Sequence, residues 1–145
     1  MMSDIVATTS KDLAIRDAVR LLGKEYRRGF TDAIKEFDNY ICPSTGDASQ
    51  SAGKSYIAYT RTLNKIFGLS KEQAEAHANG ENIRDLVPGP VLHAILLAEL
   101  DAAAEIYGGM RDKMPRQSIK MRMKEAFERH ANTLRRIQMN QRGFA

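Results

Sequence analysis

A nearly apolar run in the middle of the chain restricts its fold more than any other feature. It follows the Pro88-Gly-Pro90 break, reads VLHAILLAELDAAAEIY over residues 91–107, and is followed by Gly108 and Gly109. Proline is well tolerated in a first helical turn and glycine is frequent just beyond a helix end, so we predict one helix that ends at the glycine pair. A helix that is apolar on most sides has to be enclosed by other helices. The run therefore predicts a helical core.

Amphipathic patterns with the helical period predict a long helix on either side of this centre. Apolar side chains recur along one narrow stripe from about residue 13 to residue 41, and along a second stripe from about residue 116 to residue 141. Shorter helices are expected between them, because Gly68 and Gly80 are helix-stop residues and Ser70 begins a capping-box pattern. No stretch alternates as a β-strand does.

The length of 145 residues suits one domain with its own core. We therefore expect an all-α fold, with a single compact domain of about five helices over residues 1–145. The central apolar helix would be flanked by the long amphipathic N- and C-terminal helices. Residues 1–9 lack periodicity and are expected to form a loose N-terminus, and residues 42–54 a flexible loop rich in turn-forming residues.

The single cysteine, Cys42, excludes an intramolecular disulfide and favours a reducing, cytoplasmic location. We find no signal-peptide pattern, and the apolar run is too short for a transmembrane segment. Homo-oligomerisation stays open at this stage.

Basic charge is concentrated at the C-terminal end. Residues 1–110 hold 12 basic and 15 acidic residues, a balance of −3, whereas residues 111–145 hold 10 and 3, a balance of +7. Such asymmetry favours an anionic partner for the C-terminal helix. The alternative is an amphipathic helix whose cations extend from the edges of the core into water.

Cations form three rows on the predicted helices, one along the N-terminal helix and two on opposite edges of the C-terminal apolar stripe. We take all three as candidate nucleic-acid or acidic-partner binding residues. They are Arg16, Arg20, Lys24, Arg27 and Arg28; then Lys120, Lys124, Arg135 and Arg142; and finally Arg122, Arg129 and Arg136.

Two local motifs have stronger alternative explanations. Residues 48–55 match a loose phosphate-loop pattern, but no strand precedes them, so a flexible loop leading into a helix is favoured. Residues 60–79 have the order of a helix-turn-helix, in which Lys71, Gln73 and His77 would face DNA bases. The same order is common in proteins that bind no DNA.

Catalytic signals are weak throughout the chain. His77, His93 and His130 are scattered and match no metal-binding spacing, so we expect no catalytic residues, no metal site and no cofactor.

These patterns together favour a small non-catalytic regulatory or accessory protein that binds nucleic acid through basic helix faces and its backbone charge. The alternative is an inhibitor or adaptor that blocks or bridges an acidic partner protein.

Overall fold

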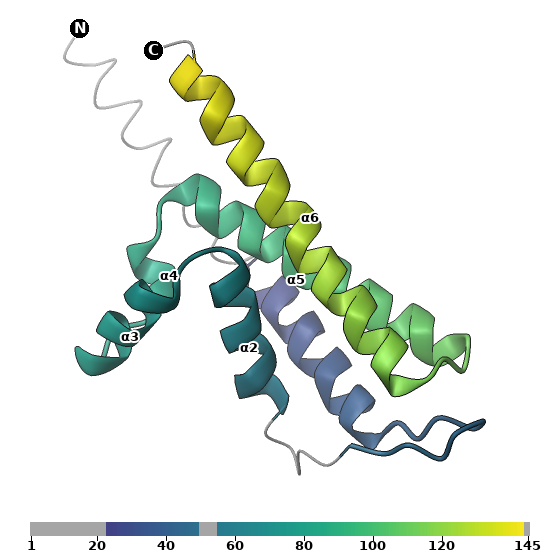
Figure 1. Ribbon diagram of the computed structural model, residues 1–145. Helices are drawn as coiled ribbons and strands as arrows, with labels where there is room; N and C mark the ends of the chain where they lie inside the picture. Colours follow the sequence, from purple (N-terminus) through teal and green to yellow (C-terminus); the bar gives the residue numbers. More distant parts are fainter. Residues whose placement is uncertain (1–22, 50–54, 144–145) are drawn as a thin grey trace, which may run out of the picture.

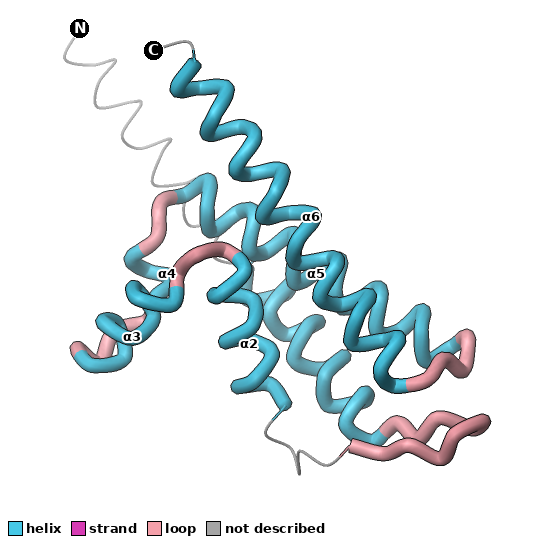
Figure 2. Tube along the Cα trace, viewed as in Figure 1, coloured by secondary structure: helices cyan, strands magenta, loops and turns pink. Residues whose placement is uncertain are grey.

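The computed structural model describes residues 23–49 and 55–143, and within these residues it contains helices and loops but no strand (Figures 1 and 2). The predicted all-α fold is confirmed. A helix over residues 23–39, called the N-terminal helix below, is followed by α2 (Ser55–Ile66), α3 (Ser70–Ala78), α4 (Ile83–Leu86), α5 (Gly89–Arg111) and α6 (Arg116–Gly143). The predicted loose N-terminus and residues 50–54 of the predicted flexible loop lie outside the described residues.

The longest helices, α5 and α6, form an antiparallel pair that runs through the molecule (Figure 1). Half of the buried residues of α5 are small, among them Ala98, Ala102 and Gly109. Small side chains let two helix backbones approach closely over a long distance. This pair forms the scaffold against which the other helices lie.

Aromatic side chains join the N-terminal helix to this scaffold. Phe30 meets Phe127 of α6 edge to face, with ring centroids 5.9 Å apart and the planes at 79°. Phe37 lies next to Tyr59 of α2, with centroids 6.5 Å apart. Both phenylalanines of the N-terminal helix are fully buried, so the core lies where the N-terminal helix, α2, α5 and α6 converge.

A buried arginine closes the end of the N-terminal helix. Arg116, the first residue of α6, donates hydrogen bonds to the carbonyl oxygens of Phe37 and Tyr40, and its guanidinium lies 4.0 Å from the centre of the Phe37 ring. The last carbonyls of a helix lack intrahelical partners and carry partial negative charge. Arg116 satisfies two carbonyls in this region with a charged donor, which makes its burial tolerable.

The predicted stop at Gly108 and Gly109 is wrong, because α5 continues to Arg111. The backbone turns instead at Lys113, which adopts a φ of 58°. Gly109 has a packing role: a Cβ placed there would lie 2.6 Å from Cγ1 of Ile119 in α6. The glycine is needed for close approach of the two helices and does not end the first of them.

Three smaller expectations also need correction. Ser70 is the first residue of α3 and makes no capping hydrogen bond, since Leu69 occupies the N-cap position. The central helix is only partly enclosed, because Leu100 on its outer side is 45% exposed. The apolar stripe predicted up to about residue 141 is not buried along its whole length: Ile137 is 49% exposed because α6 extends beyond the core at its C-terminal end (Figure 1). The stops at Gly68 and Gly80 are confirmed by φ values of +75° and +69°.

Two adjacent glycines provide a matched test of the helix pair. Gly109→Ala should lower the free energy of unfolding by about 1–3 kcal/mol, because the new methyl group displaces the buried Ile119 side chain. Gly108→Ala meets no atom within 4 Å and should raise stability by about 0.5–1 kcal/mol through helix propensity. Urea denaturation of both variants measures the difference, and equal effects would contradict the proposed packing role.

The core position of α5 can be tested at two neighbouring leucines. Leu96 is 3% exposed, whereas Leu97 is only partly buried. Leu96→Ala should cost about 2–5 kcal/mol of unfolding free energy because it leaves a cavity, and Leu97→Ala should cost less. Chemical denaturation gives both values, and a larger loss at Leu97 would mean that the helix is rotated relative to this structure.

Candidate functional site

The predicted binding cations are mostly exposed. Arg16 and Arg20 lie outside the described residues, and the side chain of Arg142, near the end of α6, is also outside them. Arg27 is partly buried. The others lie at the surface: Lys24, Arg28, Lys120, Arg122, Lys124, Arg129, Arg135 and Arg136.

One row of α6 lies beside acidic residues of α5. Arg129 donates to Oδ2 of Asp101 at 2.9 Å and lies 3.5 Å from Oε1 of Glu105. Nε2 of His130 is 3.0 Å from the same Asp101 oxygen. Arg129, the middle residue of the row with Arg122 and Arg136, is therefore paired with acids of α5.

The other row of α6 faces α2. Arg135 donates to the carbonyl oxygen of Ile66 at the end of α2 and to Oδ1 of Asn132. Lys120 and Lys124 share this side of α6 by the helical period and are exposed. Glu128, one turn beyond Lys124, is an exposed acid near this row.

The N-terminal helix also turns its basic side towards α2. The guanidinium of Arg27 lies 5.5 Å from the centre of the Tyr56 ring, and Lys35 and Tyr56 border one hollow. Asp32 and Glu36 lie on the opposite side, near α5, where burial and these two carboxylates raise the pKa of Tyr107.

Exposed basic residues occur on α2 and on the two helices that contact it through Arg27 and Arg135. We call them the α2 basic surface: Lys24, Arg28 and Lys35 of the N-terminal helix, Arg61 and Lys65 of α2, and Lys120, Lys124 and Arg135 of α6. Arg61 and Lys65 are exposed and were not among the residues predicted from the sequence. Their spacing of four residues, which places both side chains on the outer face of an amphipathic helix, is the sequence pattern that could have predicted them.

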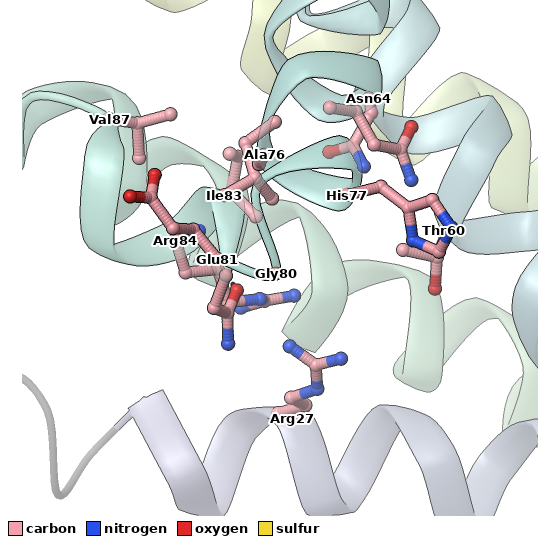
Figure 3. A pocket seen from close by; sticks show the side chains of 13 residues that line it. Arg27, Thr60, Asn64, Ala76, His77, Gly80, Glu81, Ile83, Arg84 and Val87 are labelled. Atoms are coloured by element: carbon pink, nitrogen blue, oxygen red, sulfur yellow. Dashed lines mark hydrogen bonds between the residues drawn. The ribbon is translucent and has the colours of Figure 1, made fainter.

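A cleft of about 430 Å³ opens beside this surface, between the N-terminal helix, α2, α3 and α4 (Figure 3). Its lining includes the polar residues Arg27, Asn64, Gln73 and Arg84 and the apolar residues Ile83, Val87 and Ile95. Figure 3 shows Arg27 rising towards the cleft from the N-terminal helix. The sequence does not predict this cleft, because its residues come from separate helices.

A buried ion pair supports the wall of the cleft. Arg84 of α4 donates to Oε1 of Glu99, which is 1% exposed in the middle of α5. Burial raises the pKa of the Glu99 carboxyl above its ordinary value, although the Arg84 and Arg27 guanidiniums act to lower it. Oε2 of Glu99 has no hydrogen-bond partner among the described residues.

The structure describes part of the phosphate-loop pattern and all of the helix-turn-helix segment. At the phosphate-loop pattern, the described residues before Ser55 form no strand, and the buried Ser55 hydroxyl donates to Oδ1 of Asp38. Lys54 lies outside the described residues. Over residues 60–79 the helix-turn-helix order is present; Gln73 and His77 border the cleft, and Lys71 and His77 are exposed.

Groups suited to catalysis are dispersed. Within residues 23–49 and 55–143, no three His, Cys, Asp or Glu side chains are grouped as a metal site would require. Hydrogen bonds from Ser44 and Thr45 lower the pKa of the Cys42 thiol to about 6, but its side chain has no exposed area. A substrate could therefore reach this sulfur only if the surrounding loop moved.

Comparison with known proteins gives no further guide to function. No protein-family model, curated protein or solved structure has a significant match to the chain. None of the helices in the described part is both long enough and apolar enough to cross a membrane.

The buried carboxyl of Glu99 should make stability depend on pH. Because its folded-state pKa is raised, the folded protein retains this proton longer than the unfolded chain, so the contribution to stability falls as pH rises from about 4.5 through the raised value. Glu99→Gln mimics the neutral acid and should resemble wild type at low pH. Its free energy of unfolding relative to wild type should then increase with pH, as followed by urea denaturation from pH 4 to pH 8. A constant difference would contradict this assignment.

Proposed function

We propose that this protein binds nucleic acid through the α2 basic surface, mainly by contacts with backbone phosphates. The observation that carries the proposal is the separation of charge around the bundle. Arg27 of the N-terminal helix and Arg135 of α6 contact α2, whereas Arg129 of α6 is paired with acids of α5. Two acids of the N-terminal helix, Asp32 and Glu36, lie near Tyr107 of α5, and Asp38 is the acid of this helix that faces α2, where it accepts a hydrogen bond from Ser55.

Exposed cations can displace counterions from a polyanion. Lysine and arginine at such positions orient a protein on the backbone without reading bases, so weak sequence preference is expected. The Arg135 guanidinium already donates one hydrogen bond to the carbonyl oxygen of Ile66 in α2. Lys120 and Lys124 are therefore the α6 residues best suited to phosphate contacts.

The row of Arg122, Arg129 and Arg136 fits this role less well. Arg129 is held by Asp101 and Glu105, and these carboxylates would repel an approaching phosphate. We accordingly assign the contacting row of α6 to the side of Lys120, Lys124 and Arg135.

Two double variants test the assignment with equal changes of charge on one helix. Lys120→Gln with Lys124→Gln should weaken binding to labelled DNA and RNA and flatten the log–log salt dependence, by about 0.9 for each phosphate on duplex DNA that the variant no longer neutralises. Arg122→Gln with Arg136→Gln is the matched control on the opposite edge and should change binding little. Fluorescence anisotropy at several salt concentrations measures both, with circular dichroism as the check on folding.

Two results would overturn the proposal. The first is equal weakening by both double variants, which would mean that net charge and not this surface controls binding. The second is the absence of binding to DNA and RNA even at low salt. An acidic protein partner would then become the better candidate for the same surface.

A further inference from the structure

The cleft is bordered by a buried side-chain amide of α2. Asn64 of α2 is 4% exposed and borders the cleft, and its Nδ2 has no hydrogen-bond partner among the described residues. A buried amide left unpaired costs roughly 1–3 kcal/mol. A leucine would fit a helix interior without this cost, so the amide is better explained by a ligand that accepts its hydrogen bond.

The other groups around Asn64 narrow the chemistry of such a ligand. Thr60 and Gln73 offer uncharged donors and acceptors, while Ile83, Val87 and Ile95 offer apolar surface. The basic charge of the lining is partly balanced, because Arg84 is paired with Glu99 behind the wall and the lining also includes Glu81. A multiply charged ion is therefore disfavoured inside the cleft, and a flat polar ring with hydrogen-bonding edges is favoured.

A second hollow adjoins the cleft. Its volume is about 220 Å³, it shares Arg27, Asn82 and Arg84 with the cleft, and its lining adds Lys24 and Asp85. A group bound in the cleft can thus carry a covalently attached anion that reaches Arg27 and Lys24. An aromatic base with an attached phosphate has both parts.

We propose that the cleft binds one nucleotide, with its base hydrogen-bonded by Asn64 and Gln73 and its phosphate near Arg27. A base can enter only if it is unpaired, so the nucleotide is either free in solution or part of a single strand. The strand form rests on the function proposed above, whereas the free form does not.

The free nucleotide is tested by NMR titration with the four ribonucleoside 5′-monophosphates. At least one should shift the Asn64 side-chain amide and the His77 signals, and inorganic phosphate alone should not. Asn64→Leu should weaken nucleotide binding about tenfold or more, as expected when a buried site loses a hydrogen bond. It should also raise the melting temperature of the free protein, whereas a purely structural asparagine would give a lower one. The same substitution at the exposed Asn140 is the control and should leave binding unchanged.

The strand form is tested with a single-stranded oligonucleotide, the same strand carrying abasic sites, and a duplex. Asn64→Leu should weaken binding to the normal single strand only, whereas Lys120→Gln with Lys124→Gln should weaken binding to all three. Selective weakening with the normal strand therefore supports the base site, even if the free monophosphates bind weakly.

The proposal is overturned if no monophosphate shifts these signals and Asn64→Leu binds the normal strand as wild type does. If Lys120→Gln with Lys124→Gln weakens binding to all three nucleic acids and Asn64→Leu has no effect, the protein binds nucleic-acid backbones but the cleft is not a nucleotide site. If the protein binds a monophosphate but neither single strands nor duplex, the cleft is a nucleotide site and the proposed binding to nucleic-acid backbones is wrong.

Discussion

Close packing of α5 against α6 fixes much of the remaining structure. Gly109 lets Ile119 approach the backbone of α5, and the buried alanines of α5 keep the two helices near each other along their length. Because a helix has different side chains on every face, this contact also fixes the rotation of α6 about its axis. The rotation decides which basic row meets the carboxylates of α5 and which one reaches α2. Charge separation around the bundle is thus a consequence of packing.

The N-terminal helix is positioned by a different set of forces. Phe30 and Phe37 supply buried aromatic area, and Arg116 supplies charged donors for the carbonyls at the helix end. Hydrophobic burial is not directional, whereas hydrogen bonds to carbonyls are. The guanidinium therefore fixes the depth at which this helix lies against α6, and with it the position of Arg27 beside Tyr56 of α2.

Unpaired polar atoms distinguish the centre of the molecule from an ordinary core. Asn64 Nδ2 and Glu99 Oε2 are both buried without partners among the described residues. They come from α2 and α5, on either side of the region that contains Arg27 and Arg84. Such groups reduce stability unless something else compensates for them. Their presence beside a cleft relates stability to ligand recognition, which is the physical basis of the nucleotide proposal.

The helical class, most helix positions and the concentration of basic charge near the C-terminus could all be predicted from the sequence. These features depend on local periodicity and composition, so no tertiary information was needed. The role of Gly109, the pairing of Arg129 with α5 and the gathering of Arg27, Asn64, Gln73 and Arg84 at one cleft emerged only from the folded structure. Helical periodicity identifies the faces of each helix but not the neighbour that each face meets. That choice depends on contacts between residues far apart in the chain, such as Arg116 with Phe37 and Arg84 with Glu99.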